Sequence, residues 1–527
     1  MTPSSTIEFL VWLLIAASII AVIAARLRLP YTVALVLGGL LLGSFHLPIL
    51  QNLFAHPPDW LTPDVSLVIF LPALLFEGSL KIQFRHLREN LVPISLLATM
   101  GVLAATLISG FALHWALGIP ILIALVFGVI VAATDPISIL AIFKDMAVDK
   151  RLTIVVEGES LFNDGTAVVV YGILFSAVAS SHFAIAAGIR DFVVEVAGGA
   201  AVGVVLGYIF SKVTQRIEDP EIEITLTTIL AYGSYLLAQS LHLSGVIATV
   251  AAGLMIGNFG VRTGMSSRTR IALWSFWEYA SFLINSILFL LIGLQVRLGD
   301  LFHMWRATLL TIAAVFAGRV LTVYGIVPLS NLFSTRIPFR WQHVMVWGGM
   351  RGALSLALVL SIGKHFPYRD QLLTMTFGVV AFTIVVQGIT MKPLIRWLGI
   401  GQNDDDDYSR ARVRRRAIAS ALSELESMSN SQLISGPIYE QLRHELDGRL
   451  KNANAAVDSI LGENQDRLAG ELQVARTRLI TAEKSAIEEA MQDGWISANS
   501  ASKIIDEADL HSGKLSAAAR KSAVAEQ

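Results

Sequence analysis

The sequence contains no cysteine and carries little charge. The absence of cysteine among its 527 residues excludes disulfides and thiolate metal sites. Charged residues make up only 15% of the chain and hydrophobic residues 54%, with a mean hydropathy of +0.62. These values lie outside the range of soluble domains and indicate an all-α polytopic membrane protein. The formal net charge of -1 indicates no nucleic-acid partner, so membrane lipid is the partner that composition implies.

About thirteen apolar stretches are long enough to cross a hydrocarbon core of about 30 Å. Basic residues follow the first stretch and none precedes it, so we interpret it as a retained span and not as a signal peptide. The stretches lie at roughly 8–25, 30–44, 62–80, 90–118, 119–143, 152–180, 188–213, 222–240, 242–259, 269–296, 304–330, 341–362 and 370–397.

Lysine and arginine are distributed unevenly between alternate loops, with a bias of about three to one. Loops rich in these residues stay on the cytoplasmic side. The pattern therefore places the N-terminus outside, and an odd number of spans places the C-terminus in the cytoplasm. We expect a multi-pass protein of the cell (inner) membrane.

The fifth and twelfth apolar stretches are each interrupted. Helix 5 carries Thr134, Asp135 and Pro136, and proline removes a backbone donor and clashes with the preceding turn. Helix 12 carries W-G-G-M-R-G at residues 347–352, where glycines weaken the helix. Broken helices at corresponding positions of two inverted repeats mark a transporter's binding site. The offset of seven spans would match helices 1–6 with helices 8–13.

Two aspartates, Asp135 and Asp164, lie inside consecutive apolar helices, where a carboxylate costs about 2.5 to 3.5 kcal/mol. On helix 6, Ser160 and Asp164 are four residues apart, as are Glu159 and Asn163, so each pair shares a helix face. Oxygen ligands of this kind suit a hard monovalent cation. Because burial disfavours a charged carboxylate, we expect a proton and a cation to compete for Asp164.

Two arginines also lie within apolar helices. We expect Arg351 to form a structural ion pair with Glu159 that holds helix 6 against helix 12. The alternative is that Arg351 faces a water-filled vestibule alone. Arg319, on helix 11, is expected to be the structural partner of a buried carbonyl or carboxylate.

Four sequence strings together carry a family resemblance. They are P-A-L-L-F-E-G at 72–78, A-T-D-P at 133–136, E-G-E-S-L-F-N-D-G at 157–165 and G-G-M-R-G-A-L-S at 348–355. In these strings the chain closely resembles the electroneutral cation/proton antiporters of the NhaP and NHE type. Each string alone is weak, but their joint occurrence over the first 400 residues or so is highly specific.

The resemblance implies roles for individual residues. Asp164 would be the essential carboxylate for cation and proton, and Asp135 its partner on the unwound helix 5. Ser160 and the backbone carbonyl of Thr134 would be further ligands of Na+, and Glu77 would contribute through water. Two alternatives remain open: Ser160 could instead bond back to its own helix, and Glu77 could extend into the lipid headgroups.

The resemblance also implies that Asn163 braces the site through a hydrogen bond to Thr134, and that Glu159 and Arg351 are the family's ion pair. Asn163 stands where the electrogenic branch of the superfamily has a second aspartate. Its presence is consistent with exchange of one cation for one proton.

The expected function is secondary exchange of Na+ or Li+ for H+, without cofactor or enzymatic activity, serving pH and sodium homeostasis and salt tolerance. The resemblance also implies a homodimer, in which a bundle of helices 5, 6, 12 and 13 slides against a dimerisation part. A K+/H+ antiporter of the same fold is one alternative. An intramembrane aspartyl protease is a further alternative, but the sequence lacks the G-x-G-D string of that class. A cation channel is another, but the sequence has no filter-like repeat.

The composition changes after the last span. We expect a transmembrane antiporter domain at residues 1–398 and a cytoplasmic helical regulatory tail at 399–527, whose partner the sequence does not identify. Amphipathic patterns predict tail helices at 417–425, 439–461 and 468–491.

Overall fold

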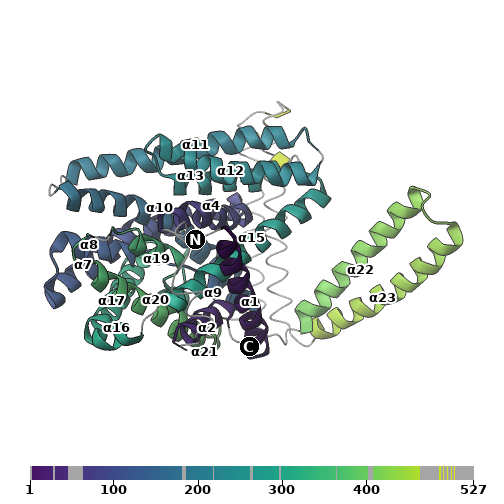
Figure 1. The fold of residues 1–527 in the computed structure, drawn as a ribbon. Coiled ribbons are helices and arrows are strands. Elements are labelled where there is room, and N and C mark those ends of the chain that lie inside the picture. The colour runs from purple at the N-terminus through teal and green to yellow at the C-terminus, as the bar shows by residue number, and fades with distance from the viewer. Residues whose placement is uncertain are drawn as a thin grey trace. The chain divides into compact units, whose positions relative to one another are not determined.

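The computed structural model describes residues 3–27, 30–44, 63–180, 185–217, 219–261, 265–295, 298–363, 365–400 and 407–462, with isolated positions between 486 and 504. Every regular element in these ranges is a helix (Figure 1). The chain divides into two compact units, Met1–Asn403 and Asp404–Gln527.

The first half of the larger unit follows the predicted apolar stretches. Each stretch up to 152–180 coincides with one helix or with consecutive helical segments, and the short helix α5 was not predicted. The elements are α1 (Pro3–Leu27), α2 (Tyr31–Ser44), α4 (Pro63–Lys81), α5 (Phe84–Glu89), α6 (Leu91–Leu96), the π-helix η1 (Leu97–Gly101), α7 (Val102–Leu117), α8 (Ile121–Ile130), α9 (Ile137–Asp145) and α10 (Lys150–Ser180).

The second half repeats this agreement, again with one unpredicted short helix, α16. The elements are α11 (Ile185–Thr214), α12 (Pro220–Ser240), α13 (Gly245–Met255), η2 (Ile256–Gly260), α15 (Ser267–Gln295), α16 (Leu298–His303), α17 (Trp305–Ser330), α18 (Phe339–Trp347), α19 (Ala353–Leu360), α20 (Arg369–Phe382), η3 (Thr383–Gln387) and α21 (Gly388–Leu398).

Seven helical spans of the described chain are long and apolar enough to cross a membrane, and three shorter apolar helices accompany them. The all-α membrane architecture is therefore confirmed, while the number thirteen and the inverted repeats remain predictions. The exposed face of α11 is apolar, as expected for a surface in contact with lipid. It presents Ile189, Val193, Val194, Val204, Val205 and Ile209.

Local sequence signals account for several helix ends. The Asp219 carboxylate accepts hydrogen bonds from the backbone N–H groups of Glu221 and Ile222, at 2.9 and 3.2 Å, and Pro220 opens α12. Ser244 caps α13 in the same way. Gly118 ends α7 with φ of 67°, a left-handed conformation that glycine adopts readily.

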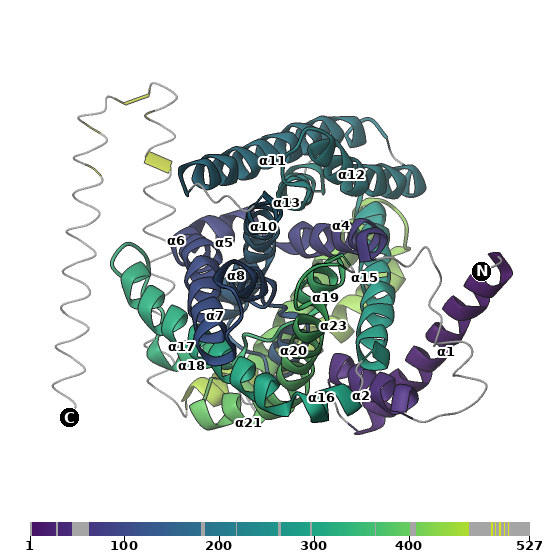
Figure 2. The ribbon, with the colours of Figure 1, turned by 60° about the vertical axis from the view of Figure 1, so that its left-hand side comes forward.

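Small residues let some helices approach closely. A Cβ on Gly39 of α2 would lie 2.4 Å from the carbonyl oxygen of Leu290 and 2.9 Å from the Cα of Gly293, both in α15. These two helices therefore meet backbone to backbone. Figures 1 and 2 both show α11 alongside α12 and α13.

The interrupted helices lie at the centre of the larger unit. Figure 2 shows α19 enclosed by neighbouring helices, and it contacts α4, α8 and α15. Residues Val126, Phe127, Val129 and Ile130 of α8 are fully buried. A polar group at either interruption is therefore surrounded by protein.

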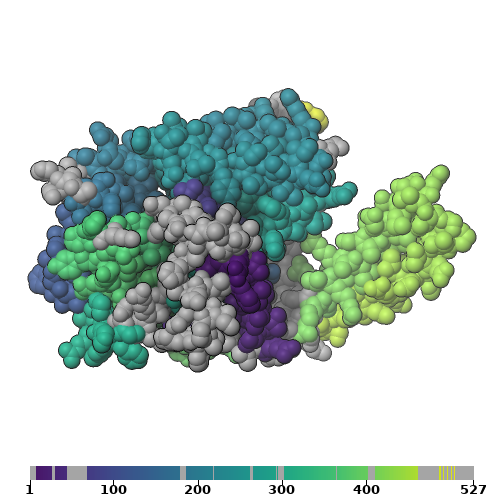
Figure 3. Space-filling model, in the orientation of Figure 1, coloured from purple at the N-terminus to yellow at the C-terminus, as the bar shows by residue number. Residues whose placement is uncertain are grey.

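The smaller unit is a helical hairpin within its described residues. It consists of α22 (Asp407–Asn430) and α23 (Gly436–Gly462), which cover the first two predicted tail helices. Their side chains meet along the hairpin (Figure 3), and they bury Ile418, Leu425, Ala453 and Val457. The third predicted helix, at 468–491, lies almost entirely outside the described residues.

Candidate functional site

The interruption of the fifth apolar stretch, 119–143, lies where the sequence predicts it. α8 ends at Ile130 and α9 begins at Ile137. The intervening residues include Pro136, which has no N–H to continue the helical ladder. The backbone groups of this segment are therefore free to bond to other parts of the protein.

The interruption of the twelfth apolar stretch, 341–362, lies directly against that of the fifth. α18 ends at Trp347 and α19 begins at Ala353. The backbone N–H of Asp135 donates to the carbonyl of Met350 at 2.8 Å, which joins the two breaks. We call this pair of joined breaks the crossing.

Asp135 lies at the N-terminal ends of two half-helices. Its carboxylate accepts a hydrogen bond from the N–H of Ile137 at 3.0 Å, at the start of α9. It also accepts one from the N–H of Ala353, at the start of α19. A negative charge is stabilised at both positions because helix N-termini carry partial positive charge.

Gly352 is required by this arrangement. A Cβ at that position would lie 1.9 Å from Oδ2 of Asp135 and 2.4 Å from its Cβ. The backbone of α19 can therefore approach Asp135 only because residue 352 has no side chain.

Arg351 lies at the two opposite helix ends. Its Nε donates to the carbonyl of Val131 at 2.6 Å, directly after α8, and its Nη1 donates to the carbonyl of Gly349, after α18. Its backbone N–H donates to Oγ1 of Thr383 at 3.1 Å. A cation is stabilised at helix C-termini, whose carbonyls lack intrahelical partners.

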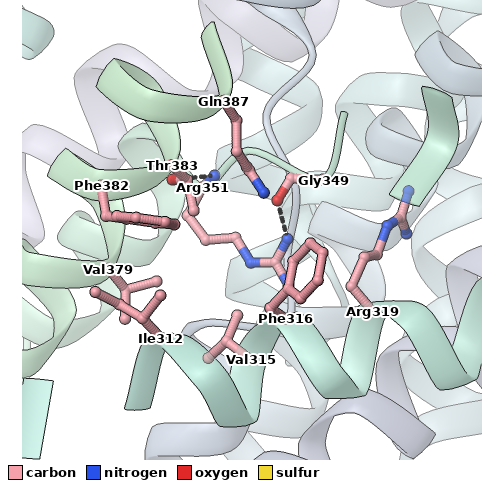
Figure 4. A pocket seen from close by; sticks show the side chains of 10 residues that line it. All are labelled: Ile312, Val315, Phe316, Arg319, Gly349, Arg351, Val379, Phe382, Thr383 and Gln387. Atoms are coloured by element: carbon pink, nitrogen blue, oxygen red, sulfur yellow. Dashed lines mark hydrogen bonds between the residues drawn. The ribbon is translucent and has the colours of Figure 1, made fainter. Parts of the chain in front are cut away.

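A small pocket surrounds the Arg351 side chain (Figure 4). Gln387 is 3% exposed, and its Oε1 has no hydrogen-bond partner among the described residues. The pocket is therefore lined by polar as well as apolar residues. The apolar residues that line the pocket are Ile312, Val315, Phe316, Val379 and Phe382.

Two hydrogen bonds to Thr134 hold α10 against the break between α8 and α9. The Ser160 hydroxyl donates to the Thr134 carbonyl at 2.5 Å, and Asn163 Nδ2 donates to Thr134 Oγ1 at 2.8 Å. The bracing bond that the family resemblance implies for Asn163 is thus present. The hydroxyl and carbonyl oxygens both retain lone pairs, so both can still ligate a cation.

Asp164 lies one turn beyond Ser160 on α10. It is only partly buried, and within the described ranges its carboxylate has no hydrogen bond or ion pair with the protein. It lies close enough to Asp135 for the two charges to interact. The structure therefore brings Asp164, Asp135, Ser160 and Thr134 together around one break.

The predicted ion pair between Glu159 and Arg351 is wrong. Glu159 pairs instead with Arg319 of α17, whose Nη1 and Nη2 bond to the two carboxylate oxygens, the second at 3.0 Å. Arg319 also donates to the carbonyl of Met345 at 2.9 Å from Nη2. The prediction of Arg319 as the partner of a buried carbonyl or carboxylate is confirmed.

Glu159 does not pair with Arg351 because Arg351 binds the C-terminal ends of two helices. Its guanidinium is engaged by the carbonyls of Val131 and Gly349, which leaves Glu159 to the other arginine. Gly349 separates the two cations: a Cβ there would lie 2.8 Å from Arg319 Nε and 3.0 Å from Arg351 Nη1. Arg351 does not face water alone either, since it is 2% exposed.

Glu77 is placed differently from the other predicted ligands. Its carboxylate forms an ion pair with Lys81, one turn later on α4. No direct contact joins Glu77 to Asp164 among the described residues. The sequence carried a signal for this pair, since a Glu–Lys spacing of four residues favours an ion pair on a helix.

Sequence reasoning missed Thr383, and it identified Gly352 only as a residue that weakens the helix, not as a close neighbour of Asp135. The hydroxyl of Thr383 is one of many in apolar helices, so its position alone did not identify it. Gly352 follows the buried Arg351 directly, and that adjacency was the available signal.

Two buried helix breaks that cross, with acid at one pair of ends and base at the other, define a secondary transporter of the broken-helix class. A family model described as "Sodium/hydrogen exchanger, transmembrane" matches residues 13–397. The chain belongs to this family.

Several relatives support the assignment. The chain is 36% identical to the Na(+)/H(+) antiporter NhaG of Bacillus atrophaeus, over 94% of this chain and 95% of that one. It is 39% identical to the Na(+)/H(+) antiporter ApNhaP of Aphanothece halophytica, over 81% of each chain.

The fold is also similar to that of the sodium proton antiporter MjNhaP1 from Methanocaldococcus jannaschii. The TM-score is 0.62 at 24% identity, and the match covers 76% of this chain and 98% of that one. At this identity the likeness supports the fold alone.

Proposed function

We propose that this protein exchanges Na+ for H+ across the membrane, with Asp164 as the carboxylate that carries either one. The observation that carries the proposal is the position of Asp164. Its carboxylate has no protein partner among the described residues, yet it stands beside Asp135 at a crossing of two broken helices.

The exchange follows from competition for a single group. A deprotonated Asp164 in low-dielectric surroundings is costly, and binding either Na+ or a proton removes that cost. Because one carboxylate cannot hold both at once, the loaded forms alternate. Movement of the helices that carry the crossing would then expose the site to one side of the membrane at a time.

The remaining ligands are oxygens of the same break. We propose that Asp135, the Ser160 hydroxyl and the Thr134 carbonyl complete the Na+ site, since hard cations prefer oxygen ligands. Asn163 braces the site through its bond to Thr134. We also propose that Glu77 contributes to the Na+ site through a water molecule. This requires that the ion pair with Lys81 leave the Glu77 carboxylate able to bind that water.

The test is a pair of aspartate variants in everted vesicles or proteoliposomes. We expect Asp164→Asn to abolish Na+-dependent H+ movement and rescue of a salt-sensitive host, because the amide carries no negative charge to balance Na+ and does not take up a proton. Asp370→Asn is the matched control, since the Asp370 side chain is 99% exposed, and it should exchange normally. Retained exchange in Asp164→Asn would refute the assignment.

The stoichiometry belongs to the same proposal. Asn163 supplies no second titrating carboxylate, which supports electroneutral exchange of one Na+ for one H+. We expect the exchange rate to be unchanged when the membrane potential is clamped at different values. A rate that follows the potential would contradict electroneutrality.

The site does not by its ligands distinguish Na+ or Li+ from K+. The named relatives are Na(+)/H(+) antiporters, and this favours Na+ over the K+/H+ alternative. A cation-by-cation exchange assay across pH measures the preference directly. A protease or a channel is not favoured, because neither gives a role to the bracing Asn163.

The setting in the cell is also a proposal. We propose that the protein resides in the cell (inner) membrane, and the bias of basic residues supports an N-terminus outside and a C-terminal tail in the cytoplasm. The family resemblance supports a homodimer and a role in sodium and pH homeostasis, and hence in salt tolerance. Cross-linking in membranes tests the homodimer. Growth of a deletion strain in high Na+ tests the role in sodium homeostasis.

A further inference from the structure

Lys81 stands between two carboxylates on different helices. It ends α4, pairs with Glu77 one turn earlier, and lies 3.2 Å from Oε1 of Glu278 on α15. The Glu77 side chain is 15% exposed, whereas that of Glu278 is 62% exposed. The ammonium therefore has one sheltered partner and one solvated partner within reach at once.

This cluster lies beside α10, the helix that carries Asp164. Glu157 precedes Asp164 by seven residues on α10, which is two turns, so the two share a helix face about 10 Å apart. Glu157 lies close enough to Glu77 and Lys81 for their charges to act on it. α4 and α10 meet here, since a Cβ on Gly78 would lie 3.8 Å from Leu161 Cδ1.

The face of α10 thus carries a continuous row of oxygens. Glu157, Ser160 and Asp164 follow one another at spacings of three and four residues. A cation that approaches Asp164 along this row first meets Glu157 and Glu77. At that point it meets the Lys81 ammonium as well.

We propose that Lys81 is a tethered competitor of the transported cation, and that it acts through Glu77. While its ammonium neutralises Glu77, the approach to Asp164 attracts Na+ less strongly. When the ammonium moves to Glu278, Glu77 becomes available to an incoming cation. Lys81 is then a positioning residue. It sets the apparent affinity for Na+ that enters from the side of the membrane on which Lys81 lies.

The chemistry of lysine suits this role. Its ammonium is a compact charge on a flexible stem of four carbons, so a few bond rotations carry it from one carboxylate to another. A pair with the exposed Glu278 is worth little net free energy. Exchange between partners therefore needs no large reorganisation of the protein.

A purely structural role makes different predictions. If Lys81 only ties α4 to α15, loss of either Lys81 or Glu278 should weaken that tie in the same direction. If Lys81 competes with Na+, the two losses should have opposite effects. Removing Lys81 takes the ammonium away from Glu77 and leaves it with its hydrogen bond to Ser281, whereas removing Glu278 leaves Lys81 with Glu77 alone.

The experiment measures KM for Na+ and kcat separately in everted vesicles, whose outer surface is the cytoplasmic face. The variants are Lys81→Met, which keeps the length of the stem, Glu278→Gln, and the two combined. Lys81→Arg is the control that retains the charge. Membrane content and thermal stability of each variant show whether it is folded.

We expect Lys81→Met to lower KM for Na+ by about threefold to thirtyfold, the effect of removing one charge beside a partly solvated site. We expect Glu278→Gln to raise KM, and Lys81→Arg to stay near the wild type. The double variant should match Lys81→Met, because Glu278 acts only through the ammonium. In each case kcat should change less than KM.

The proposal is overturned if Lys81→Met leaves KM unchanged or raises it. It is also overturned if Glu278→Gln raises KM by the same factor with Lys81 absent. The inference rests on the proposed exchange, but the two can fail separately. Absence of Na+-dependent H+ movement in the wild type would refute the exchange, whereas an active wild type with an unresponsive Lys81→Met refutes only the role of Lys81.

Discussion

At the scale of single residues, the site depends on groups that have no room to change. Asp135 occupies the space that a side chain at position 352 would need, and Arg351 is 2% exposed. Asp164 differs from both because the described protein leaves its carboxylate without a partner. The residues around the crossing therefore fix its shape, whereas the Asp164 carboxylate is held by no described protein group.

The close contact at Gly352 leads to a prediction. We expect Gly352→Ala to reduce both folded protein and Na+-dependent H+ movement, because the new methyl group would collide with Asp135. Gly363→Ala is the matched control, since a Cβ there meets nothing within 4 Å. Equal yield and transport in the two variants would show that α19 can move away without consequence.

The ion pair between Glu159 and Arg319 gives a second prediction. Arg319→Met leaves the Glu159 carboxylate buried without its partner, so we expect a loss of about 3 to 5 kcal/mol of stability. Combining it with Glu159→Gln should recover much of that loss, because the unpaired charge is removed. Thermal unfolding in detergent measures both. A double variant less stable than Arg319→Met would contradict the pairing.

The sequence predicted which charges are buried at this scale but not how they pair. Glu159, Arg319 and Arg351 were all recognisable as polar residues in apolar helices. The choice between the two arginines depends on which one is engaged by the ends of α8 and α18. Those ends come together only in the folded protein, so no spacing along the chain reveals the choice.

At the scale of helices, the crossing is a solution to four unsatisfied helix ends. A single acid, Asp135, serves the N-terminal ends of α9 and α19, and a single base, Arg351, serves the C-terminal ends of α8 and α18. Each charge thus replaces backbone partners that the interruptions remove. Because each of these side chains bonds to two helix ends, the broken helices can be stable in the interior of the protein.

We therefore expect Arg351→Met to lower the amount of folded protein in the membrane, because the carbonyls of Val131 and Gly349 would lose their donors. Arg351→Lys should be intermediate, since it keeps the charge but not the fork of donors. Arg340→Met, at an exposed position in α18, is the control. Fluorescence-detected size exclusion of solubilised membranes gives the measurement. Normal yield of Arg351→Met would refute this role.

The helices themselves were largely predictable from the sequence. Long apolar runs placed the spans, and Pro136 together with Gly348, Gly349 and Gly352 placed the breaks. The π-helices η1, η2 and η3 were not predicted. A π-turn widens one turn within a continuous helix, so it leaves the hydropathy pattern unchanged.

At the scale of the whole chain, the larger unit contains the entire candidate site. The family match ends at residue 397, and the smaller unit has its own buried contacts between α22 and α23. The change of composition after the last span predicted this division near residue 398. What the tail binds was not predictable, because its amphipathic pattern specifies a helical hairpin and no particular partner.

We expect a chain that ends at residue 403 to insert and to exchange Na+ for H+, because it retains every candidate site residue. Its pH profile or its KM for Na+ should differ from that of the full chain if the tail is regulatory. Exchange by both chains in proteoliposomes across pH measures this. Correctly inserted but inactive truncated protein would contradict a purely regulatory tail.

The balance of charge at the crossing has a consequence for leakage. Asp135 and Arg351 offset each other and the four helix ends, and Glu159 is matched by Arg319, so Asp164 is the acid at the crossing that no described basic residue matches. Under the proposed mechanism, an empty carrier would have to take an unmatched negative charge across the barrier, whereas a carrier loaded with sodium or hydrogen would not. Futile return of the vacant form is thereby suppressed, and dissipation of the ion gradients is restrained without a separate gate.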